Sequence, residues 1–353
     1  MFSAERGSRR PDRSDAASAR SGRITRPMLL IVALLLMVVS TWTAMALAPT
    51  GQPTVAALRP DLSGVVGDRT VTLSIGTGPR SALVHHPDSA VAGAPLVVVL
   101  HGESGSAKQA RDDYGWNALA DREGFVVAYP ESVGNSWNLS PDCCGQAHID
   151  HLNDLGFLHQ LVSAIGKVDL IARNRVFAVG FSDGATLAYT WACSLPGELA
   201  GIGPVAGSLA IDCPIVAPVS LAVVRGTADR PVLLASTSRS PSPGATSPTA
   251  AIPGQREHRS TSLEATLTLF RTLDNCPADP ETTTVLPVTQ RSWSCVATRT
   301  VSAAVINDAG HQWPGAEVGG HPDERTGVPG DQPSSALSAT DWLWAHLRNS
   351  RSR

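Results

Sequence analysis

Three short apolar runs constrain the fold of this chain more than any other feature. They are rich in valine, carry no charge and occupy residues 95–100, 125–129 and 176–180. Apolar side chains at every position, and not at every second one, indicate strands buried on both faces, as in a parallel sheet. Helical patterns at 107–123 and 154–172 separate these runs. Strands that alternate with helices predict an α/β fold, a mostly parallel and doubly wound sheet in a single domain.

Weaker patterns extend this alternation in both directions. Residues 70–75 and 81–86 flank the turn Gly76-Thr77-Gly78-Pro79 and predict a hairpin. Towards the C-terminus we expect strands at 219–224 and 300–306 and helices at 184–195 and 339–347. Residues 238–258 are rich in Ser, Pro, Thr and Arg and predict a flexible surface insertion.

The N-terminal region predicts export. An uncharged run, residues 28–48, follows the arginine-rich segment 1–27 and is long enough to cross a bilayer. The positive flank would stay in the cytoplasm, so everything after Ala48 would lie outside. Small residues at 44–48 suit signal-peptide cleavage, whereas the long basic segment suits an uncleaved membrane anchor, and both fates stay open. Residues 49–67 then predict a linker to a catalytic domain at 68–349.

Charge and cysteine usage narrow the class of protein. Residues 1–27 carry seven Arg and three acidic residues, which leaves 21 basic and 28 acidic residues for the rest. A net charge of −7 beyond residue 27 gives no basic face, and we therefore expect no nucleic-acid partner. All six cysteines follow the hydrophobic run, as expected for a protein of an oxidising compartment.

The cysteines allow several pairings. Cys276 and Cys295 are the best candidates for a local bridge, which would close a loop of about 20 residues. Cys143 and Cys144 are adjacent, and a disulfide between neighbours is strained. The pairing of these two with Cys193 and Cys213 stays open. The histidines His148 and His151 lie near Cys143, but no Cys-x-x-Cys accompanies them, and we expect no metal site.

The strongest chemical signal is Gly180-Phe181-Ser182-Asp183-Gly184, a G-x-S-x-G between a predicted strand and a predicted helix. The pattern is weak alone, and its position between the two elements strengthens it. A sharp strand-to-helix turn lifts the serine hydroxyl above the sheet, and the flanking glycines remove side chains that would clash there. We therefore expect Ser182 to be a nucleophile. The alternative is an ordinary serine in a glycine-rich turn.

A serine nucleophile needs a base and an acid, in the chain order Ser, acid, His. That order leaves His258, His311, His321 and His346 as possible bases. We select His311, because it follows the last predicted strand on a short loop. Asp229 follows the penultimate strand and would hold the imidazole in the required tautomer. Asp308 is too near His311 along the chain for easy pairing.

An oxyanion hole needs two fixed N–H donors. One is the backbone amide of Asp183, directly after the nucleophile. The other should come from the loop after residues 95–100, and we select the amide of Glu103, with that of Gly102 as the alternative.

These residues resemble a known family, the secreted α/β-hydrolase esterases that include polyhydroxybutyrate depolymerases and feruloyl and acetylxylan esterases. The matching segments occur in the family's order over residues 68–348: PLVVVLHG (95–102), VAYPESVGNSWN (127–138), CCGQA (143–147), NDLGFL (153–158), VFAVGFSDGA (176–185), RGTAD (225–229) and GHQWPG (310–315). The resemblance implies an α/β-hydrolase fold and the triad Ser182, Asp229 and His311. It also implies a Cys276–Cys295 bridge, and Trp137 and Trp313 look like the family's aromatic residues near the substrate cleft.

Several positions depart from the family's pattern, although none removes a triad residue. Glu103 and Ser104 occupy an oxyanion loop that in the family often carries Cys, Thr or Gly, and Asp183 replaces a common Asn. Asn153 replaces an Asp, and Arg225 replaces a His. These positions leave substrate choice open, because loops around the pocket decide it.

The sequence thus predicts an exported serine esterase that needs no cofactor. Its substrates would be short-chain acyl, hydroxyalkanoate, feruloyl or acetyl esters, small or polymeric, and it would contact a membrane only through an uncleaved N-terminal segment. A serine peptidase of the same fold is one alternative, and a non-catalytic surface-binding protein is another.

Overall fold

The computed structural model describes residues 65–76, 78–139, 145–209, 217–229, 261–316 and 332–352. All of them belong to one compact unit, Arg59–Arg353. The predicted segments 1–27 and 28–48, nearly all of the linker 49–67, and the insertion 238–258 lie outside the described residues. Among the residues that are described, no helix combines the length and the apolar character needed to span a membrane.

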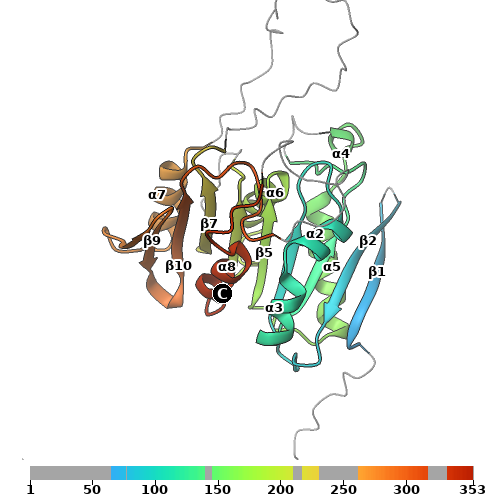
Figure 1. Cartoon of the computed structure of the whole chain (residues 1–353). Coiled ribbons are helices and arrows are strands. Elements are labelled where there is room, and N and C mark those ends of the chain that lie inside the picture. The colour runs from blue at the N-terminus through green and yellow to red at the C-terminus, as the bar shows by residue number, and fades with distance from the viewer. Residues whose placement is uncertain are drawn as a thin grey trace, which may run out of the picture. The chain divides into compact units, whose positions relative to one another are not determined.

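One ten-stranded sheet forms the centre of the described structure, in the order β1-β2-β4-β3-β5-β6-β7-β10-β9-β8 (Figure 1). The central strands, from β4 to β10 in that order, are parallel, and an antiparallel pair lies at each side. The strands are β1 (Gly67–Ile75), β2 (Gly78–His86), β3 (Leu96–Leu100), β4 (Val126–Pro130), β5 (Val176–Phe181), β6 (Gly201–Val205), β7 (Ser220–Gly226), β8 (Glu281–Val285), β9 (Val288–Ser294) and β10 (Thr300–Ile306).

Helices cover both faces of this sheet. Those that pack on one face are α5 (Asp154–Val168), α6 (Asp183–Ser194) and α7 (Leu263–Leu273). Those on the other face are α2 (Ala107–Asp113), α3 (Trp116–Glu123) and α8 (Ala339–Leu347), which stand in front of the strands in Figure 1. The short helices α4 (Gly145–Ile149) and η1 (Val296–Thr298) complete the described set. The prediction of a mostly parallel, doubly wound α/β sheet is confirmed.

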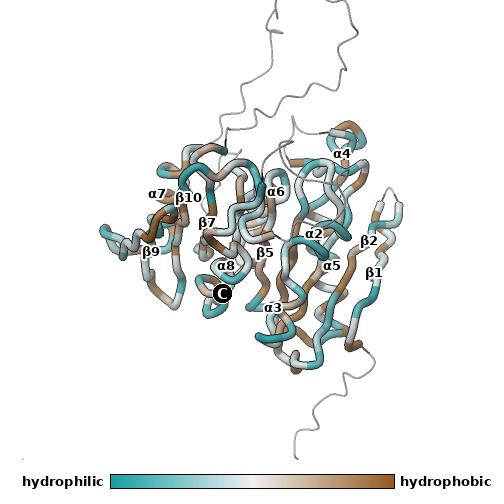
Figure 2. The backbone as a smooth tube through the Cα atoms, in the orientation of Figure 1, coloured by the Kyte–Doolittle hydropathy of each residue, from teal (hydrophilic) through white to brown (hydrophobic). Residues whose placement is uncertain are grey.

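The apolar runs behave as their sequence predicts. In β3, Leu96, Val98 and Leu100 face one hydrophobic core, while Val97 and Val99 face the other, and all five are fully buried. Figure 2 shows hydrophobic colour along central strands such as β5 and hydrophilic colour on outer loops. Burial on both faces is the physical reason for the unbroken apolar run.

Three details of the predicted elements were wrong. The helix expected at 107–123 is two helices, because Gly115 adopts a left-handed conformation (φ 75°) between α2 and α3. Strand β6 was not predicted, since its sequence GIGPV contains two glycines and a proline. The elements α7, β8 and β9 were also missed.

The predicted hairpin is present as β1 and β2, which pair antiparallel from Gly67↔His86 to Ile75↔Gly78.

Two disulfides reach into the described region. Cys276 and Cys295 form a disulfide, as the resemblance implied, and it joins the segment after α7 to the end of β9. Cys193, near the end of α6, is disulfide-bonded as well. Cys143, Cys144 and Cys213 lie outside the described residues.

Candidate active site

Ser182 lies at the sharp turn between β5 and α6. Its backbone has φ 53° and ψ −115°, a conformation that non-glycine residues rarely adopt. A Cβ atom on Gly180 would lie 2.4 Å from the Gly184 carbonyl carbon, and one on Gly184 would lie 2.3 Å from the Leu100 carbonyl oxygen. Only glycine fits at these two positions, so the turn explains both fixed glycines of the G-x-S-x-G pattern.

The turn is hydrogen-bonded to the neighbouring strand and leaves Ser182 partly exposed. The Ser182 amide donates to the Val205 carbonyl of β6 at 3.0 Å. Ser182 itself is half-buried, whereas Phe181 before it and Asp183 after it are buried. The strained residue is therefore partly exposed between two buried neighbours.

His311 contacts both Ser182 and Asp229. Its Nε2 lies 2.9 Å from the Ser182 Oγ, and its Nδ1 lies 2.9 Å from the Asp229 Oδ1. The His311 side chain is 10% exposed and that of Asp229 is 2% exposed. The three residues chosen from the sequence thus form a continuous hydrogen-bonded chain, although they are separated by up to 129 positions.

The loops that carry Asp229 and His311 are held together by backbone hydrogen bonds. They follow the parallel neighbours β7 and β10, so they leave the sheet at the same edge. The Thr227 amide donates to the Ile306 carbonyl and the Ala228 amide to the Ala309 carbonyl, each at 3.0 Å. A Cβ atom on Gly226 would lie 2.0 Å from the Ala309 oxygen, so the glycine of RGTAD permits this close approach.

The loop after β3 carries the predicted oxyanion donor Glu103. His101 is fully buried, and its Nδ1 lies 2.8 Å from the Gly102 carbonyl oxygen, which also accepts from the Gly105 amide at 3.1 Å. The His101 Nε2 accepts from the Ser132 amide, so Nδ1 is the protonated nitrogen that donates to Gly102. Because the C=O and N–H of one peptide point in opposite directions, fixing this carbonyl also fixes the Glu103 N–H.

Both candidate oxyanion amides are available in the structure. Among the residues described, neither the Glu103 amide nor the Asp183 amide donates a hydrogen bond. His101 is the positioning residue that the sequence reasoning missed. The chain order Ser, acid, His excludes it as the base, although its place between a buried strand and a glycine could have indicated a structural role.

Asp183 has an unusual environment for a carboxyl group. It is 6% exposed, and its Oδ2 has no hydrogen-bond partner in the described part of the chain. The pKa of Asp183 is raised to about 7, mainly by burial and also by the negative charge of Glu103, and His311 and His101 oppose the rise.

Trp137 and Trp313 do not form an open wall of a cleft. Trp137 is fully buried, and its Nε1 donates to the His101 carbonyl at 2.9 Å. Trp313 is 2% exposed and stacks on Tyr114, with ring centroids 4.3 Å apart. The expectation that they line the substrate cleft therefore needs correction: both rings pack inside the protein, where they support the loops that carry Glu103 and His311.

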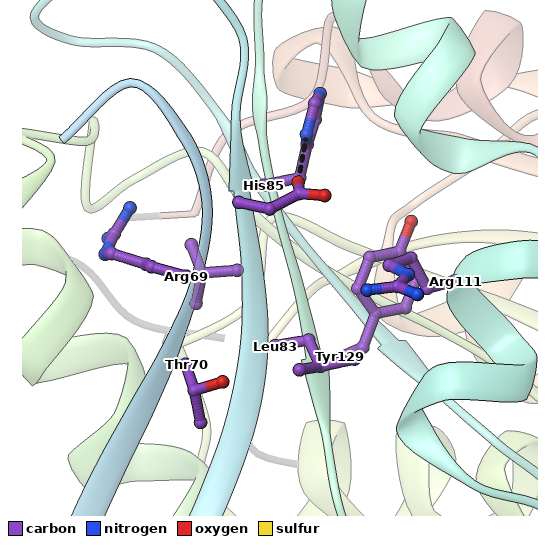
Figure 3. A pocket seen from close by; sticks show the side chains of 8 residues that line it. Arg69, Thr70, Leu83, His85, Arg111 and Tyr129 are labelled. Carbon is purple, nitrogen blue, oxygen red and sulfur yellow. Dashed lines mark hydrogen bonds and ion pairs between the residues drawn. The ribbon is translucent and has the colours of Figure 1, made fainter.

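Two other features lie apart from these residues. The rings of His148 and His151 are 6.1 Å apart, and within the described ranges no three His, Cys, Asp or Glu side chains group closely enough to hold a metal. A pocket of about 130 Å³ lies between the β1–β2 hairpin and α2. Figure 3 shows His85, Arg111 and Tyr129 around it, and none of the triad residues lines it.

Comparisons with known proteins show which proteins this chain resembles. A family model described as Esterase PHB depolymerase matches residues 80–248. A Nocardia uniformis subsp. tsuyamanensis protein named as an esterase, NocK, is 34% identical over 53% of this chain and 54% of its own length. Poly(3-hydroxyalkanoate) depolymerase C of Paucimonas lemoignei is 32% identical over 39% of this chain and 34% of its own. Feruloyl esterase B of Piromyces equi is 28% identical over 40% of this chain and 27% of its own length.

The chain thus spans about half, or less, of the length of these curated relatives. Among solved structures, an acetyl xylan esterase from Aspergillus awamori superposes with a TM-score of 0.48 at 12% identity, over 69% of this chain and 94% of that one. The strand order, the Ser182 turn and the order Ser, Asp, His along the chain are those of an α/β-hydrolase. The chain thus has the fold of an α/β-hydrolase and is similar, over residues 80–248, to the Esterase PHB depolymerase family.

Proposed function

We propose that this protein is an exported serine esterase that hydrolyses carboxylic esters through Ser182, His311 and Asp229. The observation that carries the proposal is the unbroken chain of two 2.9 Å contacts from the Ser182 hydroxyl through His311 to Asp229. The similarity of residues 80–248 to the Esterase PHB depolymerase family supports the same reaction class.

The reaction begins with the Ser182 Oγ attacking the ester carbonyl carbon. His311 Nε2 takes the hydroxyl proton as the new C–O bond forms, and Asp229 stabilises the resulting imidazolium through Nδ1–H. The amides of Glu103 and Asp183 donate to the oxyanion, and one such donor is typically worth about 3 kcal/mol of transition-state stabilisation.

The second half of the reaction releases the acid. The tetrahedral intermediate expels the alkoxide, which takes the proton from His311, and an acyl-enzyme remains on Ser182. A water molecule then gives a proton to His311 Nε2 and attacks the acyl carbon, and collapse of this second intermediate returns the proton to Ser182. Every proton is exchanged among the triad, the substrate and the attacking water, so the chemistry needs no cofactor.

The substrate class is carboxylic esters, with short-chain acyl, hydroxyalkanoate, and feruloyl or acetyl esters as the candidates. The names of the relatives include a polyhydroxyalkanoate depolymerase and a feruloyl esterase, which supports this range.

Export rests on the sequence of the N-terminus and on the disulfides. The uncharged run 28–48 follows seven arginines, and the bond between Cys276 and Cys295 requires an oxidising compartment to form and persist. N-terminal sequencing of the protein recovered outside the cytoplasm would distinguish a cleaved product, beginning near residue 49, from an anchored one.

The activity is tested with p-nitrophenyl esters from acetate to octanoate. We expect turnover by the wild-type protein and its loss in Ser182→Ala, and the chain-length profile would measure the acyl pocket. Matched p-nitroanilides test the peptidase alternative, because they present an amide to the same triad. A folded sample that cleaves no ester, or that cleaves anilides faster than esters, would contradict the proposal.

A further inference from the structure

The loop that carries the Glu103 amide is held by a second loop, residues 131–138, which follows β4 and which we call the support loop. In the support loop, the Ser132 amide donates to the His101 Nε2 at 3.3 Å, and the Trp137 Nε1 donates to the His101 carbonyl at 2.9 Å. These two contacts fix the residue at the beginning of the oxyanion loop. Other contacts must fix the residues that follow Glu103.

Asn135 of the support loop makes those contacts through two hydrogen bonds. Its backbone carbonyl accepts from the Ser104 amide at 2.8 Å. Its side-chain Nδ2 donates to the Gly105 carbonyl at 3.2 Å. Asn135 therefore holds both of the residues that come directly after Glu103.

The peptide groups on the two sides of Glu103 are thus fixed by different residues. The His101 Nδ1 lies 2.8 Å from the Gly102 carbonyl oxygen and so orients the peptide that contains the Glu103 N–H. The Ser104 amide, bound to the Asn135 carbonyl, orients the next peptide. A residue has only two soft backbone dihedrals, so two fixed peptide planes leave Glu103 little freedom. The direction of its N–H depends on Asn135 as well as on His101.

The backbone at Asn135 suits asparagine for a local reason. Gly134 and Asn135 have positive φ values, 61° and 55°, and lie between Val133 and Ser136, which form a β-bridge. Two central residues with positive φ are typical of a type I′ turn, where asparagine is among the few residues tolerated. Asn135 is exposed, so packing in the core does not require its side chain. Glycine would satisfy the same backbone but would lack the amide that donates to the oxyanion loop.

The support loop is itself anchored to a buried ion pair. The Asn138 amide donates to the Asp154 Oδ2 at 2.7 Å, and the Asp154 Oδ1 lies 2.6 Å from a guanidinium nitrogen of Arg80. The Arg80 guanidinium also donates to the Glu131 carbonyl at 3.2 Å. The Arg80 side chain is 7% exposed and that of Asp154 is fully buried. Both ends of the support loop are therefore fixed inside the protein, which makes its turn a rigid support.

We propose that Asn135 is a positioning residue of the oxyanion hole: through its two hydrogen bonds it holds the Glu103 amide where the substrate oxygen becomes an anion. This inference rests on the proposed esterase function and adds a residue to its site, outside the triad and the two donor amides. A donor held in place before the reaction needs no reorganisation when charge develops, so loosening it weakens binding of the transition state more than binding of the ester.

Asn135→Gly tests the proposal, because it removes the side-chain donor while glycine tolerates the φ of 55°. With p-nitrophenyl acetate we expect kcat to fall about 10-fold or more, a part of the roughly 10²–10³-fold that loss of a whole donor costs. We expect KM to change by less than about two-fold. Acylation and deacylation both pass through an oxyanion, so the loss appears in kcat whichever step is slower. Phenylboronic acid, a tetrahedral analogue that adds to an active serine, should bind about 10-fold more weakly.

A second variant and a matched control accompany this measurement. Asn135→Asp keeps the shape of the side chain and tolerates positive φ, but it turns an oxygen towards the Gly105 carbonyl, and we expect a kcat loss at least as large. Asn275→Gly is the control, because Asn275 is also exposed and has a positive φ (49°). It follows α7 and lies on none of the loops that carry the triad or the donor amides. Its kcat and KM should equal those of the wild type.

The outcomes separate this inference from the proposed function. A folded Asn135→Gly protein with wild-type kcat, whatever its melting temperature, would overturn the role of Asn135 while ester hydrolysis itself stands. A loss that lies in KM alone, or one that Asn275→Gly reproduces, would overturn it as well. If Asn135→Gly does not fold, Asn135→Asp decides by the same criteria. If folded wild-type protein turns over no ester, the esterase proposal fails, and the positioning role fails with it.

Discussion

At the scale of single residues, the candidate site depends on groups whose positions are determined by their neighbours. His311 contacts Ser182 through one ring nitrogen and Asp229 through the other, so its tautomer follows from the carboxylate it faces. Asp229 is nearly buried, which strengthens this contact relative to one in water.

Asp229→Asn should lower kcat by about 10³–10⁴-fold, because an amide can hold the imidazole in the wrong tautomer and cannot stabilise the imidazolium. Steady-state kinetics with p-nitrophenyl acetate measures this loss. Asp308→Asn is the control: Asp308 is exposed, lies three residues from His311, and has a positive φ (59°) that asparagine tolerates. A larger loss of kcat in Asp308→Asn than in Asp229→Asn would show that Asp229 is not the acid of the triad.

At the scale of elements, the N-terminus of α6 is pressed against β3. The closest approach is at Gly184, where an added Cβ would lie 2.3 Å from the Leu100 carbonyl oxygen and 2.6 Å from that of His101. Both neighbours are backbone atoms, so they cannot yield as the end of a flexible side chain would. This contact joins the helix that follows Ser182 to the loop that carries Glu103.

Gly184→Ala should therefore lower the free energy of unfolding by about 3 kcal/mol or more, as overpacking against a rigid backbone does. Urea denaturation followed by circular dichroism measures the change. Gly166→Ala is the matched control, because Gly166 lies within α5 and the nearest atom to an added Cβ is 3.5 Å away. We expect it to be neutral or to stabilise by up to about 1 kcal/mol. Equal losses in the two variants would contradict the close packing of α6.

The Cys276–Cys295 bond stabilises the C-terminal side of the sheet. It closes a loop with a sequence separation of 19 that contains β8 and β9. Replacing both cysteines by alanine should lower the free energy of unfolding by about 3 kcal/mol, mainly through the unfolded chain. A thermal denaturation curve identical to that of the wild type would show that the bond contributes no stability.

The elements that sequence reasoning found and those it missed differ physically. The fully buried strands β3, β4 and β5 were predicted, because burial on both faces leaves an unbroken apolar run. Strand β8 has the exposed sequence ETTTV, so no apolar pattern marks it. The helix break at Gly115 was missed since α2 and α3 face the same core, and their combined pattern hides the turn between them.

The residues of the site were predictable to a different extent. Ser182, Asp229 and His311 follow strands that were recognised, and the order of these strands along the chain restricts the choice of base and acid. Local sequence gave no sign that Trp137 and Trp313 are buried, because a ring's exposure depends on loops packed over it. The unpaired Asp183 carboxyl likewise depends on contacts between α6 and a distant loop.

At the scale of the whole molecule, buried carboxyl groups make stability depend on pH. Burial raises the pKa of both Asp183 and Asp274 to about 7, in the second case against the opposing charge of Arg299. Between about pH 4 and pH 7 the native state therefore keeps protons that the unfolded chain has released. Linkage then makes the free energy of unfolding fall as the pH rises through this window.

Asp183→Asn should remove part of this pH dependence. Between pH 5 and pH 8 we expect the free energy of unfolding of the wild type to fall by on the order of 2–4 kcal/mol more than that of the variant, since one pKa unit corresponds to about 1.4 kcal/mol. Urea midpoints at the two pH values give the difference, and Asp88→Asn, which changes an exposed carboxylate, should behave as the wild type does. A variant with an unchanged pH dependence would contradict the raised pKa of Asp183.

The most direct test of the central claim is to label the protein with a fluorophosphonate, which reacts with an activated serine. We predict a single adduct on the peptide that contains Ser182, identified by mass spectrometry, its absence in Ser182→Ala, and much slower labelling in His311→Ala. The same folded samples report whether each variant retains its structure. No adduct on folded wild-type protein, or an adduct that persists in Ser182→Ala, would contradict the assignment of Ser182 as the nucleophile.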